Sequence, residues 1–205
     1  MAISTLPLTK EHYESGYAWE SYLRGMEEYG ETSRKLYAQA TIAPETIARF
    51  RKLVERHGGS LSVSAMTEAW CGDSAVVLPI VAKLAGSVPG MRLRVLVGKQ
   101  NPALRDAYHA DGFESIPLLS FFDAQWNEIG RWMERPKSAN ARVNEWVAAH
   151  PRIAELYGRE EPEAEAELKA IFRGLVAEMA EWYPAGFWAD SLAEIEQLLR
   201  APGEV

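Results

Sequence analysis

The N-terminal part of the chain carries its apolar residues at helical spacing. Four of them fall on one face of a helix, namely Trp19, Tyr22, Leu23 and Met26. Such a stripe is typical of an amphipathic helix packed on a core. A second helix is predicted to begin at Pro44, a favoured first helical residue, and to end at Gly58-Gly59. Residues 1–57 are therefore expected to form a helical extension.

The middle of the chain switches between strand and helix patterns, which predicts a βαβ unit followed by a hairpin. The predicted strands cover residues 61–67, 91–97, 118–122 and 128–132. Helices are predicted over 74–85, closed by Gly86, and from Asn101 to Gly112, with Asn101 as the N-cap. Because the run 91–97 ends continuously apolar, we expect it to be a central parallel strand.

Helical patterns also dominate the C-terminal part. Helices are predicted within 137–158, and a longer one follows a stretch of five glutamates between Glu160 and Glu167, where the helix dipole favours anions. Its apolar stripe comprises Leu168, Ile171, Phe172, Leu175, Met179 and Trp182. Ser191 and Glu194 have the spacing of a capping box that would open a last helix. Since exposing that stripe would be costly, residues 151–205 are expected to pack on the core.

The pattern as a whole predicts one α/β domain, residues 58–150, wrapped by helical extensions at both ends. A chain of 205 residues is long enough to bury a sizeable core. No repeat or low-complexity linker interrupts it, and a hydrophobic share of 47% with 25% charged residues excludes a disordered chain.

Charge and cysteine content narrow the function classes. A net charge of -7 disfavours nucleic-acid binding, because phosphate affinity requires clustered Lys and Arg. No apolar run reaches the roughly 20 residues of a membrane helix, and the N-terminus lacks the pattern of a signal peptide. The single cysteine excludes an internal disulfide framework. A cytoplasmic protein is therefore expected, with no membrane and no nucleic acid among its partners.

The only cysteine lies in the stretch Trp70-Cys71-Gly72-Asp73-Ser74, between a predicted strand and a predicted helix. A thiol at a helix N-terminus meets unpaired N–H groups and the positive end of the dipole, and both lower its pKa. The Ser74 hydroxyl could add a hydrogen bond to the sulfur. The neighbouring carboxylate of Asp73 acts in the opposite direction, so the net shift stays open. The alternative is that Cys71 is a small buried hydrophobic residue.

This stretch resembles the active site of the thioredoxin superfamily, Trp-Cys-Gly-Pro-Cys. Pro79 falls where those proteins kink the active-site helix, and Ile116-Pro117 resembles the loop of their cis-proline. More narrowly, the Cys-x-x-Ser site and the segment Gly130–Pro136 resemble a bacterial thioredoxin-like branch with a monothiol site and helical extensions. The resemblance implies a three-layer fold, a central mixed sheet flanked by helices.

The resemblance also implies roles for individual residues. Cys71 would be the nucleophile, Ser74 would steady the thiolate, and Pro117 would shape the substrate groove. Substrate-binding positions would be Trp70, Gly72, Asp73 and Ile116. Two departures stand out: Ser74 replaces the resolving cysteine, and Ala65 stands where thioredoxins bury an aspartate. An adduct on Cys71 would then need an external thiol, such as glutathione, for its release.

Three functions remain after these departures. The leading one is a monothiol redox protein that forms mixed disulfides with a protein or small-molecule thiol or disulfide. The alternative is a non-catalytic thioredoxin-fold module that binds a protein or peptide. The third is a monothiol glutaredoxin-like cluster carrier, which the charge of Asp73 disfavours because that motif has an aromatic ring there. A homodimer is compatible with each of them.

Other candidate sites are weaker. The four histidines, His12, His57, His109 and His150, are scattered without a ligand-like pair, so no metal is expected. No nucleotide-binding glycine pattern occurs, and no resident cofactor is expected. Arg135, Lys137 and Arg142 form either a small cationic rim near the hairpin or a solvated helix start, and the second is favoured.

Overall fold

A four-stranded mixed sheet organises the computed structural model, which describes residues 8–200. The strand order is β2-β1-β3-β4, with β1 parallel to β2 and antiparallel to β3, and β3 antiparallel to β4. The strands are β1 (Leu61–Thr67), β2 (Met91–Val97), β3 (Leu118–Phe122) and β4 (Glu128–Met133). The predicted strands are thus found, β4 being one residue longer. The outer ends of both predicted extensions, 1–7 and 201–205, lie outside the described residues.

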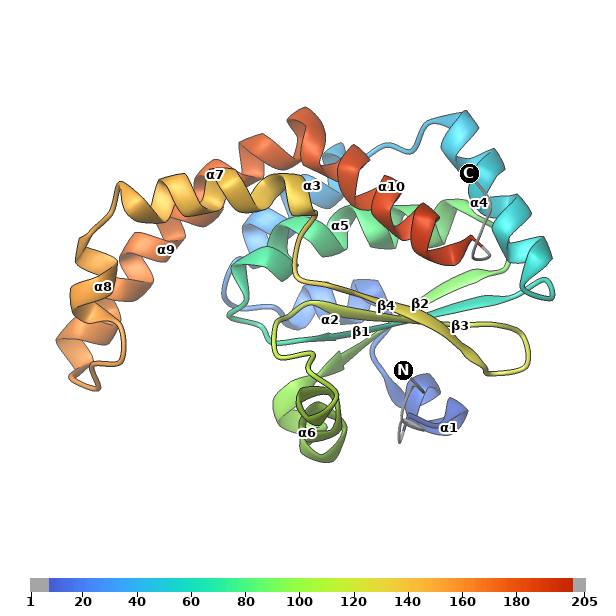
Figure 1. Ribbon diagram of the computed structural model, residues 1–205, viewed down its shortest axis with the longest axis horizontal. Helices are drawn as coiled ribbons and strands as arrows, with labels where there is room; N and C mark the ends of the chain where they lie inside the picture. The colour runs from blue at the N-terminus through green and yellow to red at the C-terminus, as the bar shows by residue number, and fades with distance from the viewer. Residues whose placement is uncertain (1–7, 201–205) are drawn as a thin grey trace.

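Helices cover both faces of the sheet, as Figure 1 shows. The short helices α1 (Lys10–Ser15) and α6 (Pro102–Ala110) lie on one face, and the remaining helices gather mostly on the other. Each face has its own apolar cluster, because successive strand residues point to opposite sides. The larger cluster holds Val63 and Ala65 of β1, and the smaller holds Met66 of the same strand. This is the expected three-layer α/β fold.

The three N-terminal helices that follow α1 contribute to the larger cluster. They are α2 (Trp19–Gly25), α3 (Gly30–Gln39) and α4 (Pro44–Arg56). Trp19, Tyr22 and Leu23 are buried on α2, as their spacing predicts. One expectation is wrong: β2 is an edge strand of the sheet, not a central one. Its apolar residues are nevertheless buried, because α1 and α2 pack against it and Tyr17 forms a β-bridge with Val95.

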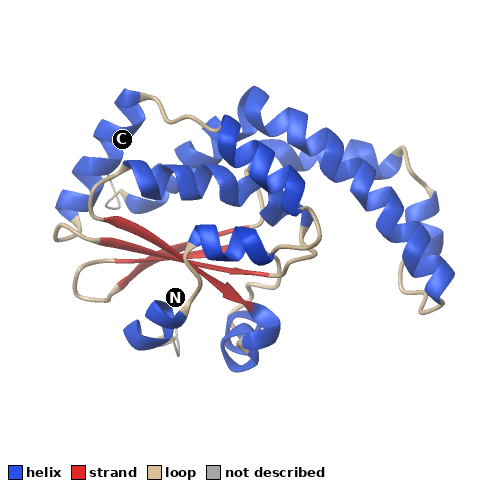
Figure 2. Cartoon of the chain, turned by 180° about the vertical axis from the view of Figure 1, so that it is seen from behind, coloured by secondary structure: helices blue, strands red, loops and turns tan. Residues whose placement is uncertain are grey.

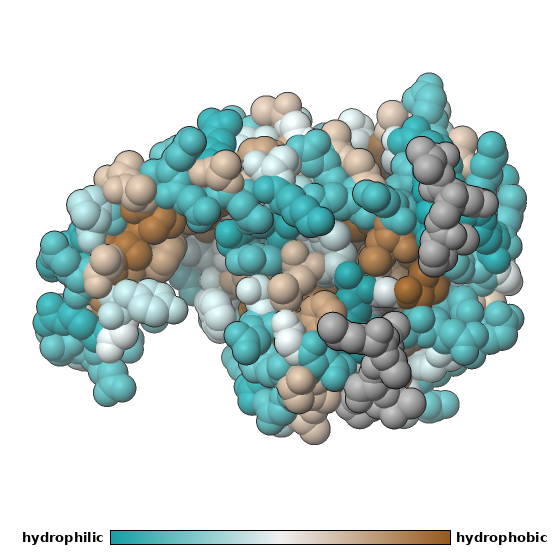
Figure 3. All heavy atoms as spheres, viewed as in Figure 1, coloured by the Kyte–Doolittle hydropathy of each residue, from teal (hydrophilic) through white to brown (hydrophobic). Residues whose placement is uncertain are grey.

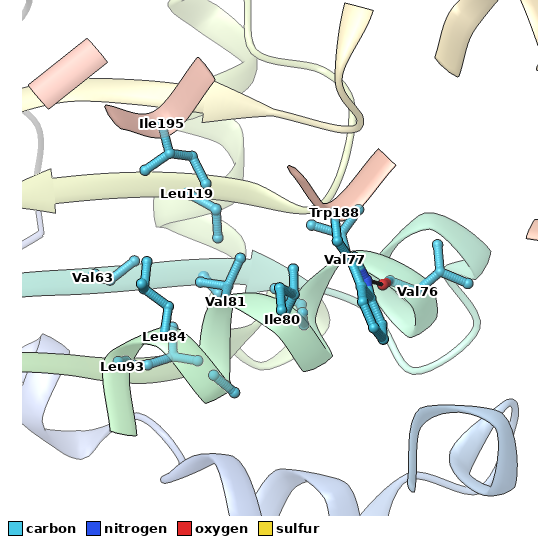
Figure 4. Close-up of a cluster of buried hydrophobic side chains, with 14 of the residues drawn as sticks. Val63, Val76, Val77, Ile80, Val81, Leu84, Leu93, Leu119, Trp188 and Ile195 are labelled. Carbon is cyan, nitrogen blue, oxygen red and sulfur yellow. Dashed lines mark hydrogen bonds between the residues drawn. The ribbon is translucent and has the colours of Figure 1, made fainter. Parts of the chain in front are cut away.

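Helix α5 (Gly72–Ser87) carries the densest part of this core (Figure 4). Its side chains meet those of β1, β3 and the last helix, α10 (Trp188–Leu199), and the Trp188 indole donates a hydrogen bond to the carbonyl of Val76. The helix runs through Gly86, contrary to prediction, and the turn after it uses Gly90 at φ 83°. A glycine with helical dihedrals costs a helix only about 1 kcal/mol and does not end it.

Asn101 is the N-cap residue of α6, as predicted, but its side chain bonds elsewhere: the amide donates to the carbonyl of Val97 and its oxygen contacts His12. The predicted capping box is wrong. Ser191 does not open α10, because a wide helical turn over 183–187 carries the chain directly into that helix. The Ser191 hydroxyl donates to the carbonyl of Phe187, and Glu194 binds other elements instead of its own helix end.

Three C-terminal helices project from the body as an arm, seen from both sides in Figures 1 and 2. The arm comprises α7 (Lys137–Ala148), α8 (Arg152–Leu156) and α9 (Pro162–Trp182). The end of α9 packs on α5, while its first half lies beyond the sheet with α8. Its predicted stripe divides accordingly, because Leu175, Met179 and Trp182 are buried whereas Leu168, Ile171 and Phe172 are half-buried.

Among residues 8–200, no helix combines the length and apolar character needed to cross a lipid bilayer.

Candidate functional site

Cys71 lies where β1 ends and α5 begins, and it is the N-cap residue of that helix. The backbone N–H of Ser74 donates to Sγ over 3.4 Å. The thiol in turn donates to the carbonyl of Ile116 over 3.2 Å, and the Ile116–Pro117 peptide bond is cis. The structure therefore brings together four of the residues singled out in the sequence, from two segments 45 positions apart.

The environment of Cys71 favours the neutral thiol. Burial, together with the charge of Asp73, raises its pKa to about 11, although hydrogen bonds from Ser74 and from the backbone act in the opposite direction. The residue is only 5% exposed. The stabilisation of a thiolate by the helix N-terminus is thus outweighed by desolvation and a like charge. At neutral pH, the thiol keeps the proton that it donates to Ile116.

Two hydroxyl groups, those of Ser74 and Thr67, lie behind Cys71, and Ser74 occupies the position where the resemblance places a resolving cysteine. Ser74 is buried, and its hydroxyl accepts a hydrogen bond from Thr67 over 2.5 Å. Ala65 is fully buried in β1, and because it is an alanine it supplies no carboxylate there. Sequence reasoning did not single out Thr67, although a polar residue at the end of a buried strand is a usable signal.

Asp73 is held by Arg135 in a two-pronged ion pair, with N–O distances of 2.8 and 2.6 Å. The same guanidinium also binds Glu134 over 2.6 Å. Glu134 has φ 68°, unusual for a residue with a side chain, and burial raises its pKa. The nearby Tyr183 hydroxyl is buried without a hydrogen-bond partner among residues 8–200, and burial together with the charge of Asp73 raises its pKa.

The predicted segment Gly130–Pro136 links the site to the last helix. A Cβ on Gly130 would lie 2.8 Å from Leu198 of α10, so glycine permits close packing there. The Trp132 indole donates to Glu194 of the same helix, and Arg135 holds Asp73. The segment thus fixes the site loop and α10 to the same hairpin.

The three cations considered for a rim do not form one. Arg135 is paired with carboxylates, as described above. The guanidinium of Arg142 lies over the Trp182 ring, 4.3 Å from its centroid, and Lys137 begins α7, where its backbone N–H donates to Glu194. The solvated helix start describes Lys137 and Arg142, which are exposed on α7, but not Arg135, which precedes the helix and is largely buried in its ion pairs.

A cleft of about 720 Å³ opens above Cys71, between the site loops and the arm. Its floor and one side come from Trp70, Cys71, Asp73, Ile116 and Glu134, and the arm supplies an apolar wall with Val147, Phe172, Leu175 and Met179. In Figure 3, the molecule is hollowed beneath the arm, and apolar side chains gather on the arm near this hollow. A Cβ on Gly72 would lie 2.5 Å from Val176, which shows how closely α9 covers the start of α5.

Comparison with known proteins identifies the fold family. A family model described as thioredoxin matches residues 16–148, well over half of the chain. The chain belongs to the thioredoxin family. No curated protein shows significant similarity to this thioredoxin-family chain. A solved structure of a protein of unknown function from Pseudomonas aeruginosa is similar at 18% identity and a TM-score of 0.51, covering 82% of this chain and 99% of that one. That likeness shows the fold alone. A second solved structure, an HIV epitope scaffold, has 21% identity and a TM-score of 0.36, covering 77% of this chain and 99% of its own.

Within the described residues of this thioredoxin-family protein, no group of three His, Cys, Asp or Glu side chains could hold a metal. His57 bonds to the carbonyl of Leu199, and His150 stacks on Trp146 with ring centroids 3.7 Å apart.

Proposed function

We propose that this thioredoxin-family protein is a binding module, whose cleft above Cys71 holds an extended segment of a partner. The observation that carries the proposal is the contrast between the cleft and its thiol. The cleft has the volume of a ligand site and an apolar wall from the arm, whereas the thiol at its floor is 5% exposed. The cleft is therefore suited to binding a partner segment, whereas its buried thiol is poorly placed to act as a nucleophile.

Three features of the site support this assignment. The chain has one cysteine, so it has no internal group that could release a mixed disulfide. Asp73 is fixed beside the thiol by Arg135, where its charge opposes thiolate formation. Gly72 is packed under Val176, which leaves little room for a partner's sulfur to approach along the helix start.

The rate of Cys71 alkylation by iodoacetamide, measured against pH in the intact protein, tests the proposal. We expect slow alkylation at neutral pH and an apparent pKa of about 11. The Cys71→Ala variant provides the blank, because it removes the only thiol of the chain. An inflection at or below 9.0, the ordinary value of the thiol, would show that the pKa is not raised and would favour redox chemistry.

Monothiol exchange is the second candidate, and one observation favours it. Sγ lies between the Ser74 N–H and the Ile116 carbonyl, beside the cis-proline, so the thiol is placed at the loop that would hold a bound segment. After losing its proton, Cys71 would attack one sulfur of a partner's disulfide, forming a mixed disulfide and releasing the other sulfur as thiolate. A second thiol from outside, such as glutathione, would then release Cys71 and become disulfide-linked to the partner.

Disulfide reduction with an external electron donor separates the two candidates. The wild type is expected not to turn over, and Ser74→Cys is expected to gain weak activity, because it restores a second thiol while Ala65 leaves no carboxylate to take its proton. Ser87→Cys, at the other end of α5, is the matched control that adds a thiol out of reach. Turnover by the wild type would replace the binding module with the redox assignment.

A further inference from the structure

Two exposed aromatic side chains line the cleft from opposite walls. Trp70, on the loop before Cys71, is 63% exposed, and Tyr157, on the arm after α8, is 75% exposed. Among the described residues, the only other exposed large hydrophobic side chain is Tyr17, which is 42% exposed and lies outside the cleft. Their ring faces are therefore available to a ligand between the arm and the body.

The charged groups around the same cleft are mainly carboxylates. Acidic side chains that line it are Glu28, Asp73, Glu114 and Glu134, and the basic ones are Arg135 and Lys169. Arg135 is shared by Asp73 and Glu134, which leaves one negative charge in excess there, and Glu28 lies 3.7 Å from Arg173. Glu114 adds a second negative charge, which the single charge of Lys169 only partly offsets. Glu114 is exposed on the loop that leads to Pro117. The cleft therefore presents negative charge together with aromatic faces.

Between these groups lies the apolar wall of the arm. Val147 of α7 and Phe172 of α9 are half-buried, so each retains apolar surface that a ligand could cover. This surface lies on helices that surround the cleft and not in the central sheet. A ligand that satisfied the whole cleft would combine apolar side chains with a positive charge.

We infer that the partner segment is a cationic, apolar peptide, with a Lys or Arg side chain among Trp70, Tyr157 and Glu114 and apolar neighbours on Phe172. The inference rests on the proposed binding function and specifies its ligand class. A cation gains from aromatic faces and from carboxylates together, whereas an anionic ligand is repelled by the same groups. Glutathione, with two carboxylates and one amine, does not fit this description.

Binding of three capped pentapeptides by calorimetry tests the inference. They share the centre Leu-Phe-Leu and carry lysine, glutamine or glutamate at both ends. We expect the lysine peptide to bind best and the glutamate peptide worst, with a difference of roughly tenfold that shrinks at high salt because exposed charges are screened.

Exposed single-residue variants locate the effect without disturbing the core. Glu114→Lys is expected to reduce or invert the preference, while Glu45→Lys, exposed on α4 outside the cleft, leaves it unchanged. Trp70→Leu and Tyr157→Leu are each expected to weaken the lysine peptide about two- to fivefold, the size of an exposed cation–π contact. The glutamine peptide should be affected less by both variants.

Two outcomes overturn different parts of the argument. Equal binding of the three peptides, or a preference unaffected by Glu114→Lys, would contradict the inference that the ligand is cationic, while the proposed binding function would be retained. Failure of all three peptides to bind the wild type would overturn the binding module as well as its ligand class.

Discussion

The β1–α5 scaffold and the C-terminal arm are built in opposite ways. In the scaffold, every residue of β1 is buried, and α5 is buried on nearly all sides. In the arm, only part of the apolar stripe of α9 is buried, and Tyr157 is 75% exposed. Burial stabilises a fold, whereas surface left half-covered beside a cleft is available to a ligand. Cys71 lies where the two regions meet, and it is enclosed by both.

The largest expected effect comes from truncating equivalent side chains in the two regions. Phe121 of β3 is fully buried in the large cluster, so Phe121→Ala should reduce the free energy of unfolding by about 3–5 kcal/mol. Phe172→Ala, on the half-buried face of α9, should cost about 1 kcal/mol. Urea denaturation monitored by fluorescence measures both, and equal losses would show that the arm is as much part of the core as the sheet.

The second expected effect concerns the thiol at the boundary. Its pKa in the folded protein is about 11, above its ordinary value of 9.0, so the folded state holds the proton more tightly than the unfolded state does. Stability is therefore unaffected below pH 9 and is lost as the pH rises from 9 towards 11.

Comparison with Cys71→Ala isolates that loss, since the buried tyrosines titrate in both proteins. The wild type should lose about 2 kcal/mol more than the variant between pH 9 and 11. Identical pH profiles for the two proteins would mean that the thiol is not desolvated as the structure indicates.

The scaffold was largely predictable from sequence, and so were the helices of the arm, but the placement of the arm and its cleft was not. Strands β1, β2 and β3 were placed at their observed ends, because period-two alternation and glycine punctuation depend on local sequence. The prediction of β2 as a central strand was wrong, because its continuous apolar run indicates only that the strand is buried. Tyr17 and the N-terminal helices bury this edge strand from outside the βαβ unit.

The same limit applies to the site. Cys71 and Ser74 were found from the local pattern, and their contact follows from the strand-to-helix turn. Ile116 and Pro117 were found from the resemblance alone, because the fold brings their loop to the sulfur from 45 positions away. The pairing of Asp73 with Arg135 joins residues 62 positions apart, and no local pattern signals it. Tyr157 drew no attention in the sequence either, because exposure at a cleft depends on how α8 is placed by its neighbours.

The smallest expected effect tests the contact between the two regions. Gly72 and Gly86 both lie in α5, but a Cβ on Gly72 would be 2.5 Å from Val176 of the arm, whereas a Cβ on Gly86 would meet no atom of the described part of the chain within 4 Å. Gly72→Ala should therefore cost about 1–3 kcal/mol through overpacking. Gly86→Ala should stabilise by about 0.5–1 kcal/mol, because alanine has the better helix propensity.

The alkylation rate of Cys71 in Gly72→Ala distinguishes a local clash at Val176 from a movement of the whole arm. If α9 shifts to relieve the contact, Cys71 becomes more accessible, and its alkylation at pH 8.5 should accelerate in Gly72→Ala but not in Gly86→Ala. A destabilised Gly72→Ala protein with unchanged alkylation would mean that the strain is absorbed by the Val176 side chain. In that case the arm keeps its position over the thiol, and the effect of the added methyl group is confined to the contact between residue 72 and Val176.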